Sequence, residues 1–231
     1  MFFGIDLTYI YLVLPAVLFA LWAQFNVQST FSKYSKVQSR SGMTGYDSAR
    51  RILDANGLHN VGIARVSGNL TDHYNPKDNT IYLSDSVYGE TTAAAIGVAA
   101  HEAGHAVQHA VGYTPMKVRS AIIPVTQIGS NLAMPLFLLG IILSYPTLAM
   151  IGVIAFGAST LFQLVTLPVE FNASSRAMDA LRGYNLDSDD LASARKVLTA
   201  AALTYVAALA VSLANLLRLF LIASRMRGRR D

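Results

Sequence analysis

The stretch Ala99-Ala100-His101-Glu102-Ala103-Gly104-His105-Ala106-Val107 is the part of the chain from which the fold is best inferred. It lies in an alanine-rich segment that predicts a helix beginning near residues 86–90 and ending before Gly112. On a helix, residues i and i+4 lie on one face about 5–6 Å apart, so both imidazoles can reach one metal ion. With Glu102 placed to take a proton from water, this HExxH pattern is typical of hydrolytic zinc sites.

A helix whose histidines only pack or form hydrogen bonds is the alternative interpretation. The chain has five histidines and three glutamates, so chance would produce the pattern in roughly one shuffled sequence in several hundred. We therefore treat His101 and His105 as candidate metal ligands and Glu102 as the candidate general base.

The composition indicates an integral membrane protein. Hydrophobic residues make up 53% of the chain and charged residues 14%, whereas a soluble domain carries about 25% charged residues. Four apolar stretches reach the roughly 20 residues needed to cross a bilayer, at residues 5–24, 120–143, 146–167 and 198–223. The first has no basic residue before it and no cleavage site after it, which favours a retained span over a signal peptide. We expect a mostly helical α+β membrane protein with four transmembrane helices.

The polar segments between these stretches define the predicted organisation. We expect a first span at residues 1–25, a cytoplasmic domain at 26–119, a transmembrane hairpin at 120–167, a cytoplasmic segment at 168–197, a fourth transmembrane or membrane-associated helix at 198–223 and a basic tail at 224–231. Both internal polar segments are rich in Lys and Arg, which by the positive-inside rule places them on the cytoplasmic side of a bacterial inner membrane. The basic tail would then lie outside, unless the last stretch, which contains Arg218, does not cross fully.

Residues 26–119 predict a minimal zincin-like domain made of a helix, a small antiparallel sheet and the metal-binding helix. Thr44 and Asp47 form a capping-box pattern that opens a helix ending at Asn56-Gly57. Strand-like runs follow at residues 61–66, 70–74 and 80–83, with a turn between the last two. This domain is too short to bury a large core alone, so we expect it to pack on the membrane helices.

The third metal ligand must be a carboxylate or a histidine, because the chain has no cysteine. A catalytic zinc has three protein ligands and one open position. Glu90 lies about three turns before the motif and is too distant, whereas Glu170 follows Pro168 in the first turn of a predicted helix over residues 169–182. Asp179 competes for the same role, and Glu170 also fits a simple charge that complements the helix dipole.

Three segments carry a family resemblance, namely Asp72-His73-Tyr74-Asn75-Pro76 with the Ile-Tyr-Leu-Ser strand after it, His101–Gln108, and Pro168-Val169-Glu170-Phe171-Asn172-Ala173-Ser174. Over nearly its whole length the chain resembles the YugP-type membrane neutral zinc metallopeptidases, which are similar in layout to the HtpX and CAAX prenyl-protein endopeptidases. In these relatives the glutamate of a Glu-x-x-Ala-Asp segment is the third zinc ligand, so the resemblance implies this role for Glu170. Ser174 replaces the aspartate of the more distant relatives, and Asp179 is the candidate to supply its contact.

The predicted function is zinc-dependent hydrolysis of peptide bonds, with activity falling in acid because the ligating imidazoles must be neutral. Arg176, His73 and His109 are candidates for oxyanion stabilisation or substrate binding, and each also fits a structural role. We expect an extended substrate to bind beside the strand at 70–74 or the one at 80–83. The resemblance implies membrane or membrane-proximal proteins as substrates.

Other function classes fit the sequence less well. A catalytically silent scaffold with a structural zinc would close the site with a fourth ligand, such as Asp179 or His73, and would not need Glu102. An intramembrane-cleaving protease would carry the motif inside a span, and a transporter would show an inverted repeat. The net charge of +4 is explained by membrane topology, and we find no pattern for nucleic-acid or organic-cofactor binding.

Overall fold

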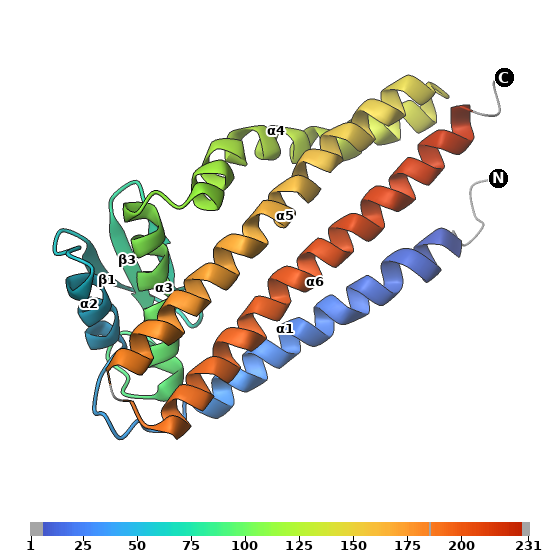
Figure 1. Ribbon diagram of the computed structural model, residues 1–231. Helices are drawn as coiled ribbons and strands as arrows, with labels where there is room; N and C mark the ends of the chain where they lie inside the picture. The colour runs from blue at the N-terminus through green and yellow to red at the C-terminus, as the bar shows by residue number, and fades with distance from the viewer. Residues whose placement is uncertain (1–6, 185, 228–231) are drawn as a thin grey trace. The chain divides into compact units, whose positions relative to one another are not determined.

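The computed structural model describes residues 7–184 and 186–227 of the chain (Figure 1). In chain order the elements are η1 (Tyr9–Val13), α1 (Leu14–Tyr34), α2 (Gly45–Ala55), β1 (Gly62–Val66), β2 (His73–Asn75), β3 (Thr80–Ser84), α3 (Ala93–Ala110), α4 (Thr114–Ile142), α5 (Pro146–Gly183) and α6 (Ser188–Arg227). Two compact units emerge from the contacts within the chain. We call them the helical unit (Met1–Ala23, Val118–Leu167, Thr204–Asp231) and the mixed unit (Gln24–Lys117, Pro168–Leu203).

Within the described residues, four helices are long and apolar enough to cross a membrane, as the sequence predicts. They are η1 with α1, α4, α5 and α6, judged by length and composition. Large apolar side chains on these helices are exposed, as suits a hydrocarbon surrounding; Phe25 and Ile142 are both 71% exposed. The first two residues of the predicted stretch 5–24 and residues 228–231 of the predicted tail lie outside the described residues.

Within the helical unit, small residues allow close approach between α4 and α5. A Cβ atom added at Gly152 would lie 2.6 Å from the backbone nitrogen of Phe137. The Thr160 and Ser212 hydroxyls form a 2.8 Å hydrogen bond that joins α5 to α6. Close backbone packing and polar contacts of this kind hold membrane helices together, because lipid provides no hydrophobic driving force between them.

Helix α5 runs without interruption from Pro146 to Gly183, so the prediction of a new helix starting at residue 169 is wrong. Pro168 lies inside α5 and not at its beginning. A proline removes one backbone hydrogen bond, but helices of membrane proteins tolerate this, and α4 likewise contains Pro124 and Pro135. Glu170 is therefore an interior helix residue, which excludes its alternative role as a charge at a helix N-terminus.

The sheet of the mixed unit contains both parallel and antiparallel strand pairs, which corrects the prediction of an antiparallel sheet. Its strand order is β1-β3-β2; β2 and β3 are antiparallel as predicted, whereas β1 and β3 are parallel. The loop after β1 contains Gly68 and Leu70, both with positive φ (111° and 56°), so the chain turns there and passes to the far side of β3. This conformation also explains why β2 begins at His73 and not at residue 70.

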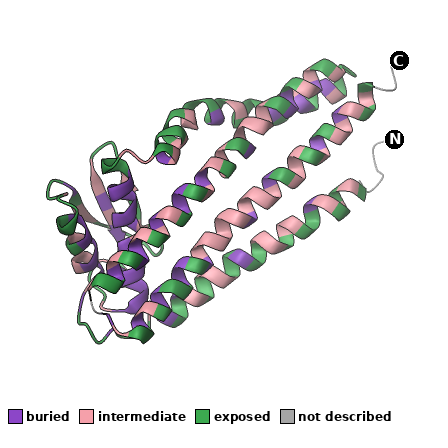
Figure 2. Cartoon of the chain, in the orientation of Figure 1, coloured by how far each residue is buried: buried purple, intermediate pink, exposed green. Residues whose placement is uncertain are grey.

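Helix α2 begins with the predicted capping box, in which the Thr44 hydroxyl accepts from the Asp47 backbone and the Asp47 carboxylate accepts from the Thr44 backbone. The metal-binding helix α3 begins at Ala93, later than the predicted 86–90, because the Thr92 hydroxyl accepts a hydrogen bond from the backbone of Ala95 and caps it there. Along α3 most residues are buried (Figure 2). The core of the mixed unit joins this helix to α2, β3 and the later part of α5, through residues such as Leu53, Ile81, Ile96, Ala103 and Leu181.

Candidate metal centre

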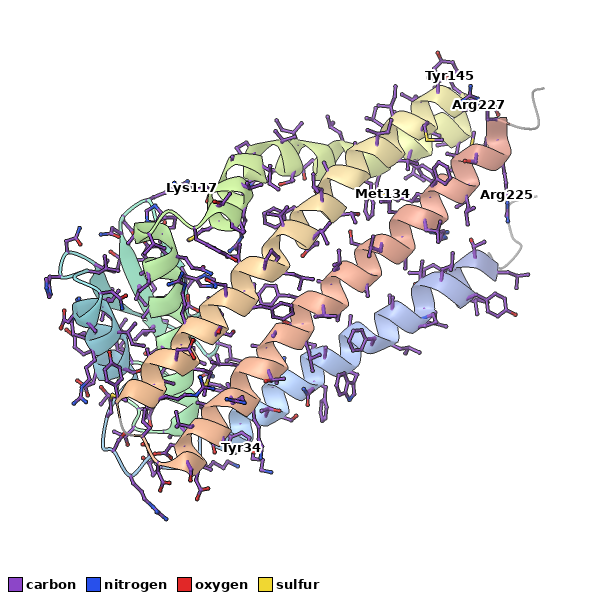
Figure 3. The ribbon with its side chains drawn as sticks, in the orientation of Figure 1. Tyr34, Lys117, Met134, Tyr145, Arg225 and Arg227 are labelled. Atoms are coloured by element: carbon purple, nitrogen blue, oxygen red, sulfur yellow. The ribbon has the colours of Figure 1, made fainter. Side chains whose placement is uncertain are left out.

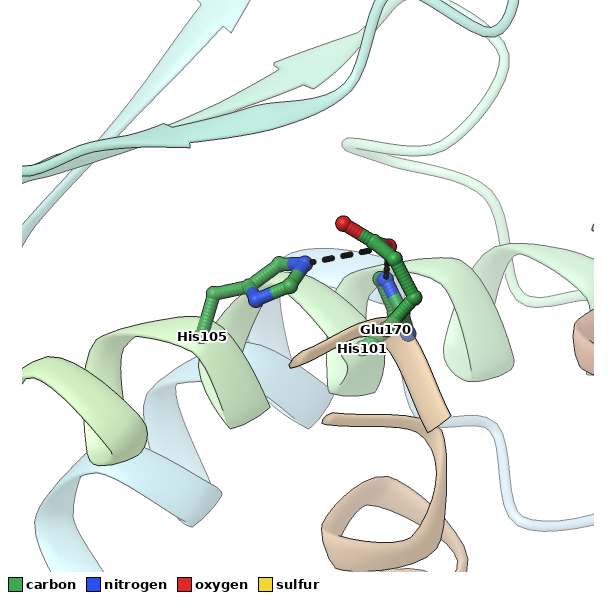
Figure 4. Close-up of side chains that lie close together, drawn as sticks. All are labelled: His101, His105 and Glu170. Atoms are coloured by element: carbon green, nitrogen blue, oxygen red, sulfur yellow. Dashed lines mark ion pairs between the residues drawn. The ribbon is translucent and has the colours of Figure 1, made fainter. Parts of the chain in front are cut away.

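Three predicted ligands meet in the mixed unit between α3 and α5 (Figure 4). His101 and His105 lie one turn apart on α3, with ring centres separated by 4.6 Å. Glu170 reaches them from α5, and its Oε2 lies 3.3 Å from His101 Nε2 and 3.6 Å from His105 Nε2. One candidate ligand atom from each residue lies within 4.8 Å of the others. Glu170 is 2% exposed, so the group is closed to bulk water on the α5 side.

A hydrogen-bond chain fixes the ring of His105 and its tautomer. The Gln108 amide nitrogen donates to the Val169 carbonyl at 2.8 Å and to Asn172 Oδ1 at 3.0 Å, so its Oε1 must be the atom that faces His105. Oε1 lies 2.9 Å from His105 Nδ1 and can only accept, which makes Nδ1 the protonated nitrogen. The lone pair of Nε2 is then directed to Glu170, as a metal ligand requires.

The ring of His101 has its own partner on α5. Its Nδ1 lies 3.1 Å from the hydroxyl oxygen of Ser174, which leaves Nε2 directed to Glu170. Ser174 thus contacts the ligand itself, and the expectation that Asp179 supplies this contact is wrong. Asp179 is exposed and pairs with Arg182 one turn further along α5.

Gly104 permits the close approach of the two helices that carry the ligands. A Cβ atom at this position would lie 2.7 Å from the carbonyl oxygen of Ala173 on α5, closer than real Cβ contacts allow. Ala173 lies between Glu170 and Ser174, which contact the two histidines. A glycine between the two histidines is therefore part of what brings Glu170 into range.

Glu102 lies between the two ligands on α3 and is 7% exposed. The negative charge of Glu102 acts to raise the pKa of both His105 and Asp72. Burial lowers the pKa of the His105 imidazole, but the adjacent carboxylate of Glu170 and the charge of Glu102 outweigh burial and raise it. Burial and the charge of Glu102 raise the pKa of Asp72, against the hydrogen bonds from Ser84 that lower it. The negative surroundings of the imidazoles favour a bound cation.

The remaining candidate residues lie outside the ligand group. His73 on β2 is exposed and stacks on Tyr82 with ring centres 5.0 Å apart. His109 Nδ1 lies 2.8 Å from the Tyr74 hydroxyl, so it links α3 to β2. Arg176 Nε donates to Asn172 at 2.8 Å and so joins the chain that ends on His105. Among the described residues, the metal-binding group consists of His101, His105 and Glu170 and includes neither Asp179 nor His73.

Several residues of this site escape prediction from the sequence. Gln108 has a local signal, since it is a polar residue three positions after His105 on an apolar helix. Asn172 and Tyr74 have none, because their roles depend on α5 and β2 packing against α3. The donor set of two imidazoles and one carboxylate is the kind that binds catalytic zinc.

Comparison with known proteins identifies the family. The sequence profile of a family described as "Putative neutral zinc metallopeptidase" matches residues 9–224. The chain belongs to this family. It is 48% identical over 216 residues to the protein named "Putative membrane protease YugP" from Bacillus subtilis (strain 168), covering 93% of this chain and 96% of that protein. No solved structure matches the chain. Family membership and the ligand group together establish zinc as the metal that His101, His105 and Glu170 are positioned to hold.

Proposed function

We propose that the protein is a membrane zinc endopeptidase that hydrolyses peptide bonds with Glu102 as its general base. The observation that carries this proposal is the convergence of three ligands, His101, His105 and Glu170, around one point, with Glu102 buried on the same helix. A catalytic zinc has three protein ligands and keeps its fourth position for water. The family of zinc metallopeptidases supports it. A scaffold that used zinc only for structure would have no need of this arrangement.

Each residue of the site has a separate role in the proposed hydrolysis. Bound zinc supplies a Lewis acid that polarises the scissile carbonyl and lowers the pKa of water. Glu102 accepts a proton from the attacking water and then delivers it to the leaving amine as the C–N bond breaks. Gln108 and Ser174 keep the two imidazoles oriented through Nδ1. We assign Glu170 the role of third ligand.

An extended peptide is the substrate form that the sheet can accept. Strand β3 is the central strand and is paired on both sides over residues 80–82, which argues against substrate binding along this strand. Strand β2 is at the edge of the three-stranded sheet and lies against α3 through the Tyr74–His109 hydrogen bond. We propose that the substrate adds to β2 as a further strand and that His109 is a substrate contact. Arg176 and His73 remain candidates for oxyanion stabilisation.

Charge supports a cytoplasmic location for the site. Lys and Arg are abundant in the mixed unit, which by the positive-inside rule belongs on the cytoplasmic side of a bacterial inner membrane. Substrates would then be membrane proteins or proteins close to the cytoplasmic leaflet.

Zinc content and cleavage, measured on the same preparations, test the proposal. The Glu102→Gln variant should keep its zinc and lose cleavage of an unfolded protein substrate by at least about 100-fold, since general-base catalysis contributes about that much. The Glu170→Ala variant should lose zinc as well as activity. Glu90→Gln, which changes an exposed glutamate outside the site, is the matched control and should behave like the wild type. Retained cleavage in Glu102→Gln would overturn the assignment, and a zinc-loaded wild type without any hydrolytic activity would favour the scaffold.

A further inference from the structure

A cavity of about 370 Å³ lies in the mixed unit between α1 and α6, and none of its lining residues belongs to the metal centre. Three cationic side chains line it, Lys33 from α1 and Arg195 and Lys196 from α6. Hydroxyl and amide groups that can donate hydrogen bonds lie beside them, on Asn26, Thr30 and Thr199. Cations together with neutral donors form the kind of surface that binds a phosphate group.

Two of these cations lie close to the ring of Tyr34. The ammonium groups of Lys33 and Lys196 lie 5.5 and 5.7 Å from the centre of this ring. Tyr34, which Figure 3 labels at the end of α1, is 9% exposed and is held in the core of the mixed unit. A fixed aromatic ring attracts cations to its face, but it does not neutralise them.

The positive charge in the cavity is not balanced by carboxylates. Some cations of the mixed unit have such partners: Arg40 pairs with Asp187, and Arg65 with Asp85. Among residues 7–184 and 186–227, no ion pair involves Lys33, Arg195 or Lys196. The cavity is therefore a concentrated site for an anion.

A second cavity shares Arg195 with the first, so the cations of the two cavities can be compared. This second cavity has a volume of about 350 Å³ and lies between α5 and α6. Its other cation, Arg182, is already paired with Asp179. The excess positive charge therefore belongs to the cavity at Lys33 and Lys196.

Both helices change from apolar to polar at the cavity. On α1, the exposed apolar side chain of Phe25 comes directly before Asn26. On α6, Arg195 and Lys196 come before the apolar run that begins near Ala200. In a helix that crosses a bilayer, such a boundary lies at the depth of the lipid headgroups.

We propose that this cavity binds the headgroup phosphate of an anionic phospholipid, with Lys33, Lys196 and Arg195 around the phosphate. A lipid is favoured over free phosphate because apolar residues adjoin the charged groups: Ala200 and Leu203 line the cavity, and the exposed Phe25 precedes its residue Asn26. The proposal requires that these helices lie in a bilayer, and it is independent of the peptidase chemistry.

The binding test uses the full-length protein in phosphatidylcholine vesicles with and without phosphatidylglycerol. We expect phosphatidylglycerol to raise the midpoint of thermal unfolding, and native mass spectrometry to find one tightly retained phosphatidylglycerol molecule per chain. In the double variant K33Q/K196Q the affinity should fall roughly thirtyfold, as expected for the loss of two basic residues near a lipid surface. The control K36Q/K77Q removes the same charge from exposed positions outside the cavity and should keep the wild-type affinity.

Additional variants and competing ligands separate binding at this cavity from general attraction to charge. The charge-preserving variant K33R/K196R should retain the lipid, and the single variants K33Q and K196Q, each weaker by roughly fivefold, replace the double variant if it does not fold. An equal loss in K36Q/K77Q would mean general surface attraction and overturn the site. Stabilisation by inorganic phosphate equal to that by phosphatidylglycerol, or displacement of the lipid by a polyglutamate peptide, would also overturn the lipid assignment.

Discussion

Gln108 Oε1 accepts a hydrogen bond from His105 Nδ1 over 2.9 Å, and Gln108 is completely buried while it does so. Through its amide nitrogen the same side chain is anchored to Val169, the neighbour of Glu170 on α5. One glutamine therefore connects the histidine ligand on α3 to the helix that carries the third ligand. A change at this residue should alter metal binding without touching a ligand.

The Gln108→Leu variant should bind zinc about 10- to 100-fold more weakly, because a ligand that loses its outer hydrogen bond loses orientation and basicity. Competition with a chromophoric chelator measures this affinity directly. Gln28→Leu, on the exposed surface of α1, is the control and should match the wild type. Unchanged zinc affinity in Gln108→Leu would show that the hydrogen bond does not orient His105.

The Gly104→Ala variant tests the spacing between α3 and α5. The new methyl group would meet the Ala173 carbonyl at 2.7 Å, so the helices must shift, and overpacking of this kind costs about 1–3 kcal/mol. We expect a lower free energy of unfolding in detergent together with reduced zinc content. Gly89→Ala, where a Cβ atom meets nothing within 4 Å, provides the comparison. If both variants keep full stability and zinc, Gly104 does not set the spacing.

The Ser174→Asp variant places a carboxylate beside His101 Nδ1, which Ser174 contacts at 3.1 Å. A carboxylate accepts more strongly than a hydroxyl and makes the ligand more basic, so zinc affinity should rise by up to about tenfold. The exposed Ser175→Asp change adds the same charge one residue further along α5. An equal gain in both variants would assign the effect to overall charge and not to the contact with His101.

Stability in acid should depend on the capping box of α2. Hydrogen bonds from the Thr44 hydroxyl and backbone hold the pKa of Asp47 below its ordinary value of 3.8. A carboxyl with a depressed pKa contributes stability above its unfolded pKa and loses that contribution as the pH falls through its folded pKa. Solvent screens this partly exposed group, so we expect Asp47→Asn to cost only about 0.5 kcal/mol near neutral pH.

Denaturant unfolding measures the free energy of unfolding of the wild type and of Asp47→Asn. The difference between these two free energies should shrink as the pH falls below about 4. Other carboxyl groups titrate in both proteins and largely cancel in the difference. A gap that stayed constant throughout the acid range would contradict the assignment of the low pKa to this cap.

Local spacing explains which parts of the molecule could be predicted. The pairing of His101 with His105 and the capping of α2 by Thr44 and Asp47 depend on residues within one helical turn, which sequence periodicity reports directly. The apolar stretches are similarly local, because length and composition alone make a helix able to cross a membrane.

Contacts between distant segments explain the rest. The parallel pairing of β1 with β3 depends on a loop with positive φ at Leu70. The alternation of side chains along a strand does not indicate whether the neighbouring strand is parallel or antiparallel. Pro168 reads as a helix start by itself, but α5 continues through it. The contact of Ser174 with His101 spans α5 and α3, so no local pattern indicates it.

The edge strand β2 is only three residues long, and if the substrate adds to it as proposed above, this has a consequence for which proteins can be cleaved. Its main-chain groups can pair only with a polypeptide that is already stretched out and has vacant partners of its own. An intact helix or sheet has none to offer, whereas a damaged or unassembled protein near the bilayer does. Whether the substrate protein is unfolded, more than its amino-acid sequence, would then decide whether it is cleaved.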